Sequence, residues 1–389
     1  MAAYLDGRRD QYFQIGHRCI RFTNYVGVIQ VQDMVIEVLP KTGKVSDKDL
    51  WRDVLIDMLK ASGFLNITTT SDAHLKLRKG TLLDLYYQVF LDQCRQLVSE
   101  GLLRQYIQKT SNRTALKGRL LFQDQLKQNL VRKERFVTSA QDYTEDNLFN
   151  QILLRALTIL RAVSGNPAHR RDRTMLQYEF WGGSDQHFNQ ASFERLRYGR
   201  TTERYRTAIR LAELIILNYL PDLRGGNRSV LAIMFPMEDL FEAYVTTALK
   251  SASRGTGFRV ETQQVRRFWR PEGGRSKTIR PDIVIDWTDV SGNRRIVLDT
   301  KWKVPGDKKP TDGDLKQMFV YNKYFGAESS NLLYPTTGES QPVNGLFMGD
   351  LNGSCSMWHA PILDSDRARL NRDLGVQLLS TIQSTIACT

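Results

Sequence analysis

Two apolar, β-branched segments separated by a short turn constrain the fold of this chain more than any other feature. The first is Arg280-Pro-Asp-Ile-Val-Ile-Asp-Trp287, and the second is Arg294-Arg-Ile-Val-Leu-Asp-Thr-Lys-Trp-Lys303. Runs of Val and Ile of this length are typical of strands, and the intervening Ser291-Gly-Asn293 is typical of a turn. The two segments therefore predict a β-hairpin.

Three ionisable side chains stand out in this predicted hairpin. Side chains alternate across a strand, so Asp299 and Lys301 share one face, whereas Thr300 takes the other. If the turn is centred near residue 291, Asp282 lies opposite roughly residue 300 and within reach of both. We therefore expect two carboxylates and one amine to converge at one edge of a sheet.

This trio of side chains suits a specific chemistry. Paired carboxylates with open coordination positions suit Mg²⁺, which prefers oxygen ligands and keeps several waters. The ion can polarise a phosphodiester and lower the pKa of a bound water, and a nearby lysine can stabilise the charge that develops on the phosphate. The alternative is a surface hairpin with exposed salt bridges, each worth about 0–1 kcal/mol. Ile296 and Leu298 argue against it, because they make the second strand at least half buried.

Helical patterns on both sides of the hairpin supply further polar side chains. Upstream, a helix that begins at residue 237 has an apolar face, and Glu242 flanks this face and offers a third carboxylate. Downstream, residues 314–321 have a helical pattern, in which Gln317 and Tyr321 share a face because they are four residues apart.

The chain is basic, with 55 Lys and Arg residues against 42 Asp and Glu residues and a net charge of +13. This excess favours a polyanionic partner such as a nucleic acid, because each phosphate that is neutralised releases counterions. Solvated helix faces and loops are the alternative, so charge alone does not name the function. One cluster of basic residues comprises Arg266, Arg267, Arg270, Arg275, Lys277 and Arg280.

Several classes of protein are disfavoured by the composition. No run approaches the ~18 apolar residues that a membrane span needs. The first residues lack the apolar stretch of a secretory signal. The four cysteines are far apart and form no Cys-x-x-Cys pair, which disfavours a disulfide scaffold or a zinc ribbon. We therefore expect a cytoplasmic protein without a membrane partner.

The apolar periodicity predicts an α+β protein. Strands of a second hairpin are expected at 25–31 and 34–39, and a helix begins near residue 47 with Asp47 or Ser46 as its cap. Further helices are expected at 82–107, 145–163 and 204–220.

The order of these elements predicts three domains. The Pro and Gly density of residues 221–229 is typical of a boundary. We expect a β-rich N-terminal domain at 1–75, a helical middle domain at 76–225 and an α/β domain at 226–389.

Several motifs carry a resemblance to known families. Pro281-Asp282 followed by Asp299-Thr-Lys301 resembles the PD-(D/E)xK nuclease motif, and Gln317-Met-Phe-Val-Tyr321 resembles the Gln-x-x-x-Tyr motif of the RecB-like branch of those nucleases. Residues 25–31 and 36–41 resemble the N-terminal signature of McrC proteins, the nuclease subunits of McrBC modified-cytosine restriction systems. Other segments fit that family in order, and the resemblance spans most of residues 20–335. These segments are Leu116-Lys-Gly-Arg119, Asn147-Leu-Phe-Asn150, Leu240-Phe-Glu242 and Leu332-Leu-Tyr-Pro335.

The resemblance implies an endonuclease domain of the PD-(D/E)xK type at 226–389. Asp282 and Asp299 would bind Mg²⁺, with Mn²⁺ as the alternative ion, and Lys301 would be the catalytic lysine. Glu242 would assist the metal or the water. Two further residues, which would line the site or hold double-stranded DNA, are Gln317 and Tyr321.

The resemblance also implies a partner. McrC proteins work with McrB, an AAA+ GTPase ring that recognises modified DNA and translocates it. The N-terminal β region of this chain would dock on such a ring and stimulate its GTPase. The implied function is a DNA endonuclease subunit of a restriction system for methylated DNA.

Two other functions fit the same residues. A non-catalytic adaptor would activate and anchor a motor ring, and its acidic pocket would be vestigial. A stand-alone repair or junction nuclease of the same fold would cut without nucleotide or partner. The intact set of Asp282, Asp299 and Lys301 argues against the adaptor, and the McrC-like N-terminal segment argues against the solitary nuclease.

Overall fold

The computed structural model groups the chain into two compact units, each of which is assembled from separate stretches. The first unit comprises Met1–Arg8, Val28–Ile36 and Thr69–Ile233, and the second comprises Arg9–Gly27, Glu37–Thr68 and Met234–Thr389. The expected boundary at 221–229 lies outside the described residues, and the division into three domains stays a prediction. The structure describes residues 12–17, 19–32, 34–42, 47–65, 81–163, 167–180, 186–220, 230–289, 292–303, 309–338, 340–348 and 353–387.

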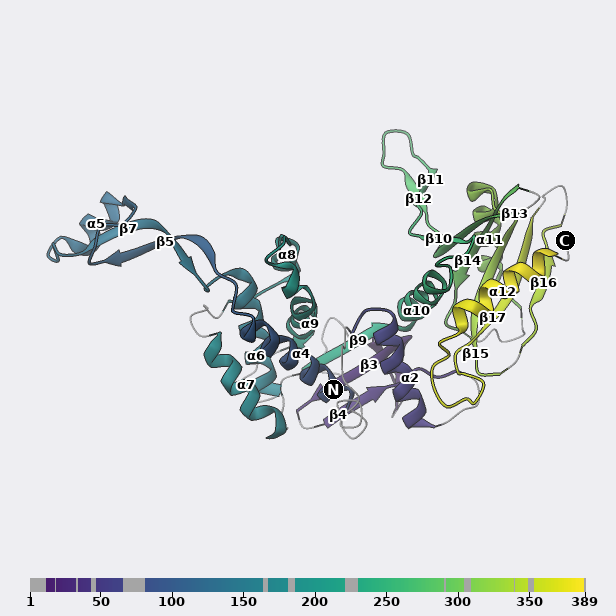
Figure 1. Ribbon diagram of the computed structural model, residues 1–389, viewed down its shortest axis with the longest axis horizontal. Helices are drawn as coiled ribbons and strands as arrows, with labels where there is room; N and C mark the ends of the chain where they lie inside the picture. The colour runs from purple at the N-terminus through teal and green to yellow at the C-terminus, as the bar shows by residue number, and fades with distance from the viewer. Residues whose placement is uncertain are drawn as a thin grey trace. The chain divides into compact units, whose positions relative to one another are not determined.

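The second unit is built on a six-stranded mixed sheet with the order β10-β13-β14-β15-β17-β16 (Figure 1). Strand β14 pairs in an antiparallel manner with β13 and in parallel with β15, so it is a central strand. Strand β17 is parallel to β15, whereas the two edge strands are antiparallel to their neighbours. The strands are β10 (Arg259–Thr262), β13 (Ile283–Asp289), β14 (Gly292–Thr300), β15 (Ser329–Thr336), β16 (Val343–Leu346) and β17 (Ser354–Pro361).

Strands β13 and β14 confirm the hairpin that the sequence predicts. Ile283 pairs with Leu298, and Asp289 pairs with Gly292 at the turn, of which Ser291 lies outside the described residues. Continued by one residue, this register places Asp282 opposite Asp299 rather than opposite residue 300, which corrects the expectation by one position. The correction places the two carboxylates in one cross-strand pair, and such pairs share a face of the sheet.

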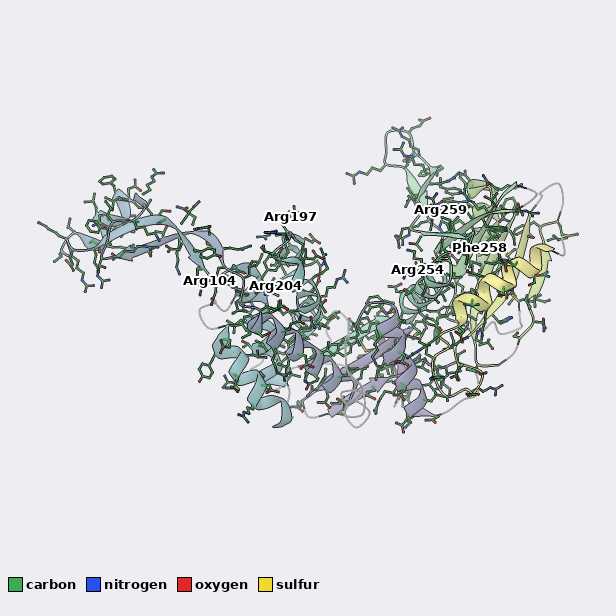
Figure 2. All side chains as sticks on the ribbon, viewed as in Figure 1. Arg104, Arg197, Arg204, Arg254, Phe258 and Arg259 are labelled. Atoms are coloured by element: carbon green, nitrogen blue, oxygen red, sulfur yellow. The ribbon has the colours of Figure 1, made fainter. Side chains whose placement is uncertain are left out.

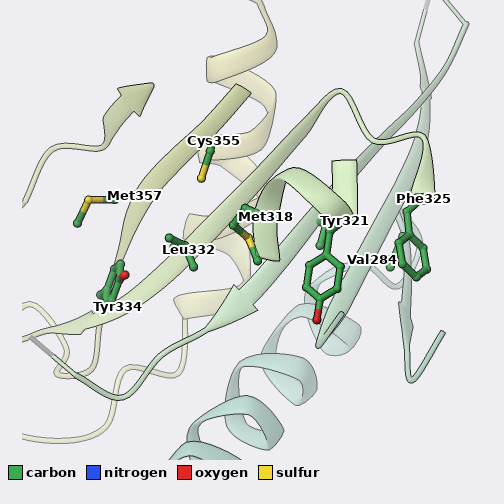
Figure 3. Packing of buried hydrophobic residues seen from close by; sticks show 9 residues of the cluster. Val284, Met318, Tyr321, Phe325, Leu332, Tyr334, Cys355 and Met357 are labelled. Carbon is green, nitrogen blue, oxygen red and sulfur yellow. The ribbon is translucent and has the colours of Figure 1, made fainter. Parts of the chain in front are cut away.

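Helix α11 (Asp312–Phe325) covers one face of this sheet (Figure 3). Its residues Met318, Tyr321 and Phe325 recur at helical spacing and are buried in the same cluster as Val284 and Val297 of the hairpin. The apolar contact fixes the helix over the face that also carries the two aspartates. The cluster is completed by Leu332, Tyr334, Cys355 and Met357.

Three further helices pack together in the second unit. Helix α10 (Met237–Ala252) contacts both α2 (Lys48–Ala61) and α12 (Leu374–Ala387). The expected cap of α2 is confirmed, because the Asp47 carboxylate accepts hydrogen bonds from the backbone N–H groups of Asp49 and Leu50. Buried apolar residues of α2 stabilise this packing through the area that they remove from water.

Two short strands of the second unit form a hairpin outside the main sheet. Strands β11 (Arg266–Trp269) and β12 (Lys277–Ile279) are antiparallel and lie in the chain between β10 and β13. In Figure 1 this hairpin projects away from the six-stranded sheet.

The first unit combines helices with a three-stranded sheet of order β5-β7-β6. The expected helix at 82–107 ends at Ser99, because Gly101 has a φ of +86° and the pattern alternates from Gln105 onward. The region that was expected to be helical therefore also contains a sheet. Its elements are α4 (Leu82–Ser99), β5 (Gln105–Arg113), β6 (Arg119–Leu120), α5 (Phe122–Asn129), β7 (Phe136–Thr144), α6 (Leu148–Val163), α7 (Pro167–Glu179), α8 (Gln190–Glu194), a 3₁₀ helix (Glu203–Tyr205) and α9 (Arg206–Leu217).

A further sheet has four strands in the order β4-β3-β9-β8. It confirms the strands expected at 25–31 and 34–39. Its members are β3 (Tyr25–Val31), β4 (Met34–Val38), β8 (Tyr219–Leu220) and β9 (Val230–Pro236), and β1 (Phe13–Gly16) and β2 (Cys19–Phe22) form a separate pair. The fold is thus a mixed α and β architecture, as the sequence predicts. Among the described residues, no helix has the length and apolar character that crossing a membrane requires.

Candidate active site

Asp299 and Lys301 lie at the carboxyl end of β14 and form the centre of the candidate site. The Asp299 residue is only 1% exposed, and Nζ of Lys301 lies 2.6 Å from its Oδ2 atom. Apart from this ammonium group, no hydrogen-bond donor among the described residues reaches Oδ2. Buried polar atoms normally have a hydrogen-bond partner, so Oδ2 retains lone pairs that a ligand can use.

Asp282 is held at the same edge by Thr300. Both the backbone N and the Oγ1 atom of Thr300 donate hydrogen bonds to Oδ2 of Asp282, at 2.7 and 2.8 Å. The only sign of this role in the sequence is the position of Thr300 between Asp299 and Lys301. The two carboxylates are therefore positioned from adjacent strands.

Gln317 and Tyr321 of α11 form a hydrogen-bonded chain that ends on Asp299. Nε2 of Gln317 donates to Oδ1 of Asp299 at 3.2 Å and to the hydroxyl of Tyr321 at 2.8 Å. The Tyr321 hydroxyl in turn donates to the backbone carbonyl of Arg280 at 2.9 Å. The two helix residues expected near the site thus lie beside Asp299. The role of the Arg280 carbonyl could not be predicted from the sequence, because every residue has a backbone carbonyl.

Glu242 reaches the site from α10, on which it follows the buried Phe241. The ring of Phe241 makes an edge-to-face contact with the ring of Trp302, with 5.3 Å between centroids. Since Trp302 directly follows Lys301, this contact fixes α10 against the end of β14. Burial and then the charge of Asp282 raise the pKa of Glu242 to about 7, with smaller contributions from other carboxylates that include Asp299.

The pKa values of the two central residues, Asp299 and Lys301, are both raised, but for different reasons. Burial and the nearby charge of Asp282 raise the pKa of Asp299 to about 7, although Lys301 opposes this shift. Burial lowers the pKa of Lys301, but the charge of Asp299 and the contact with it outweigh burial, so the net shift is upward. Lys301 therefore stays protonated at neutral pH, whereas the crowded carboxyl groups favour an additional cation.

The donor set fits Mg²⁺. Among the residues that the structure describes, no group of three or more His, Cys, Asp or Glu side chains is placed to hold a metal ion. Mg²⁺ does not need such a cage, because it usually takes one or two carboxylates and completes its shell with water and substrate phosphates. Asp282 and Asp299 supply two carboxylates, and among the described residues no hydrogen-bond donor other than Lys301 contacts Oδ2 of Asp299.

A second lysine ties the segment after the site to α11. Nζ of Lys303 lies 2.7 Å from Oδ2 of Asp314, which also accepts a hydrogen bond from the backbone N of Thr311 in the capping box of the helix. This ion pair places the first turn of α11, and with it Gln317, relative to the end of β14. No residue pattern in the sequence indicates this positioning contact.

These observations define a class of protein: a mixed α/β chain with a carboxylate and lysine cluster at the end of a central strand, between two helices. The model of the family described as McrBC 5-methylcytosine restriction system component matches residues 20–335. This chain belongs to that family.

One solved structure contains a chain with the same fold. A half-complex from a tetradecameric assembly of Thermococcus gammatolerans McrB AAA+ hexamers with bound McrC contains a chain that is 21% identical, with a TM-score of 0.66. The match covers 96% of this chain and 86% of that one. A cryo-EM structure of the Thermococcus gammatolerans McrBC complex gives a TM-score of 0.45 at 23% identity, over 59% of this chain and 67% of that one. No curated protein matches the sequence.

Proposed function

We propose that this chain is the Mg²⁺-dependent DNA endonuclease subunit of a restriction system for methylcytosine-containing DNA. The observation that carries the proposal is the ion pair of Lys301 with the buried Asp299, beside Asp282, which Thr300 holds just before the neighbouring strand β13. Membership of the McrBC family supports the restriction role. The proposal assigns these residues to the PD-(D/E)xK type of site that their order resembles.

We further propose that the chain acts with an AAA+ GTPase ring and stimulates its GTPase. The structure that shares the fold contains McrB AAA+ hexamers with bound McrC, which supports a partner of this kind. In the proposal, the N-terminal β region at 1–75 docks on the ring, and recognition of the modified base belongs to the partner.

The carboxylates of the site are arranged to hold the ion and the attacking water. Asp282 and Asp299 would be the ligands of Mg²⁺, which supplies polarisation of the phosphodiester and a lower pKa of bound water. Thr300 fixes the carboxylate of Asp282, and Gln317 fixes that of Asp299. Glu242 would accept the proton that the attacking water loses, because its pKa of about 7 lies near neutral pH.

Lys301 acts in this proposal as a cation and not as a base. Its raised pKa keeps the ammonium group protonated at neutral pH. In this state it can donate hydrogen bonds to the attacking water and to the phosphate oxygen on which negative charge develops. Arginine in its place would change both the reach and the geometry of the donors.

A cleavage assay with matched variants tests the proposal. The full chain is mixed with its AAA+ partner, GTP, Mg²⁺ and methylated duplex DNA, and nicking and GTP hydrolysis are measured together. Asp299→Ala and Lys301→Ala should abolish nicking while GTPase stimulation persists. Asp286→Ala is the control, because Asp286 lies in β13 on the same face as Asp282 but pairs with Arg295 at 2.6 Å.

The same assay separates the other two functions. Stimulated GTP hydrolysis without nicking under any divalent metal would identify an adaptor. Cutting that needs neither nucleotide nor partner would identify a stand-alone nuclease. Nicking that survives Asp299→Ala would show that the site assignment is wrong.

A further inference from the structure

The β11–β12 hairpin carries an unusual excess of unpaired positive charge. We define the basic ribbon as residues 264–280, which contain six Lys or Arg residues and one carboxylate, Glu272. Four of the six cations are exposed and make no ion pair or side-chain hydrogen bond within the described part of the chain. These four are Arg267, Arg270, Arg275 and Lys277.

Arginines of the main sheet in the same unit behave differently. Arg259 pairs with Glu261, Arg294 pairs with Glu328 at 2.7 Å, and Arg295 pairs with Asp286 at 2.6 Å. Their positive charge is thus compensated locally, whereas the four exposed cations of the basic ribbon have no such partner in the described part of the chain. An uncompensated cluster of this kind is typical of a surface that binds a polyanion.

The base of the basic ribbon is anchored on α11, which also carries Gln317. The ring of Phe268 meets the ring of Tyr324 edge-to-face, with 5.2 Å between centroids. The guanidinium group of Arg266 donates to the Tyr324 carbonyl and lies 5.0 Å from the ring centre of Phe325. Trp269, in contrast, is 55% exposed and makes no aromatic contact with another described residue. Figure 2 shows side chains standing out from the hairpin.

The basic ribbon leads directly into the candidate active site. Strand β12 continues through Arg280 and Pro281 to Asp282, and the Arg280 carbonyl accepts the hydrogen bond of Tyr321. Lys277 precedes Asp282 by five residues, which span at most about 17 Å when extended. Because B-DNA rises 3.4 Å per base pair, this reach corresponds to about five base pairs.

We infer that the basic ribbon binds the DNA duplex within about half a helical turn of the phosphate that is cut. The inference rests on the proposed function and adds the residues that hold the substrate beside the catalytic edge. A two-stranded β-ribbon fits the major groove of B-DNA, and its free cations bind phosphates without reading sequence. The exposed ring of Trp269 contacts the sugars or base edges between them.

Salt-dependent DNA binding tests this inference without requiring catalysis. Binding of the full chain to a fluorescent DNA duplex is measured in EDTA by anisotropy at several salt concentrations. Arg267→Ala/Lys277→Ala should weaken binding about tenfold or more at low salt and reduce the slope of log affinity against log salt by about 2. The control Lys41→Ala/Lys48→Ala removes the same charge from exposed positions of the second unit and should leave the slope unchanged.

The contribution of the ring is tested separately. Trp269→Ala should weaken binding about fivefold with the salt slope unchanged, since this contact releases no counterions. Unchanged affinity would overturn the role of Trp269. Failure of the unaltered chain to bind, or an equal slope for the ribbon variant and the wild type, would overturn the inference as a whole.

Cleavage by the same proteins distinguishes this inference from the proposed function. If the wild type binds DNA through the basic ribbon but never nicks it with partner, GTP and Mg²⁺, the nuclease proposal fails, whereas DNA binding by the basic ribbon is upheld. If the wild type nicks DNA and the ribbon variant binds and nicks equally well, the basic ribbon fails and the nuclease stands.

Discussion

Thr300 donates two hydrogen bonds, from its backbone N and its hydroxyl, to a single oxygen of Asp282. These two hydrogen bonds link the residue that ends β14 to the residue that precedes β13. The carboxylate is therefore oriented by the protein itself, so that a ligand meets a preformed site. Contacts of this kind tune the affinity of metal sites in proteins.

Loss of the Thr300 hydroxyl should weaken the use of Mg²⁺. We expect Thr300→Val to lower the nicking rate about 10- to 100-fold at limiting Mg²⁺, with partial recovery at high Mg²⁺, because the carboxylate loses one of its two donors. Nicking is measured against Mg²⁺ concentration. Thr300→Ser keeps the hydroxyl and should remain close to the wild type, and equal curves for the Val variant and the wild type would contradict the positioning role.

Without metal, the stability of the protein should fall as the pH rises. The pKa of Asp299 is about 7 in the folded state, against about 4 for an unfolded aspartate. Between these values the folded state binds more protons than the unfolded state, so the free energy of unfolding decreases from about pH 4 to pH 7. Urea denaturation in EDTA measures this decrease. It should be smaller in Asp299→Asn, and an equal pH dependence of the two proteins would count against the raised pKa.

Binding of Mg²⁺ should release protons in a narrow pH range. Asp299 and Glu242 are partly protonated near pH 7 without metal, and a cation favours their ionised forms. Calorimetry of Mg²⁺ binding in buffers with different ionisation enthalpies should show proton release near pH 7 and almost none about two units higher. Asp299→Asn should reduce the release, and binding without any proton release near pH 7 would contradict the prediction.

The contact between α10 and α12 should not tolerate a larger residue at Gly375. A Cβ atom at this position would lie 2.2 Å from the Ala248 carbonyl oxygen. Gly375→Ala should therefore lower the free energy of unfolding by about 1–3 kcal/mol, as overpacking does. At Gly313 in α11 the atom nearest to an added Cβ would be 3.8 Å away, so Gly313→Ala should raise the free energy of unfolding by about 0.5–1 kcal/mol. Urea denaturation of both variants checks the contrast, and similar losses in both would refute it.

The parts of the fold that are local in sequence were the ones that could be predicted. Alternating apolar residues and a turn predict the hairpin of β13 and β14, and helical spacing places Gln317 and Tyr321 on one face. The helix expected to run to residue 107 was too long, because Gly101 ends it and the following residues alternate as a strand. The parallel pairing of β14 with β15 and β17 joins distant segments, and no local pattern indicates it.

The candidate site shows the same division. The acidic and basic side chains could be identified, because a buried strand that ends in Asp299 and Lys301 is chemically unusual. The contacts of Thr300 with Asp282, and of Tyr321 with the Arg280 carbonyl, could not be identified in this way. The first contact depends on the exact register of the two strands, and the second depends on a backbone atom. Neither the register nor a backbone atom can be recognised from the residue types alone.

The second unit is discontinuous along the chain, and α2 near its start packs against α10, which is synthesised much later. During translation, α2 cannot bury its apolar face against α10 until α10 has been synthesised. The second unit can therefore complete its folding only near the end of translation. A fragment cut out at 226–389 would lose α2 and expose apolar surface on α10. A fusion protein that is to contain the folded second unit therefore needs the N-terminal segment with α2 as well, joined to the rest through a new loop.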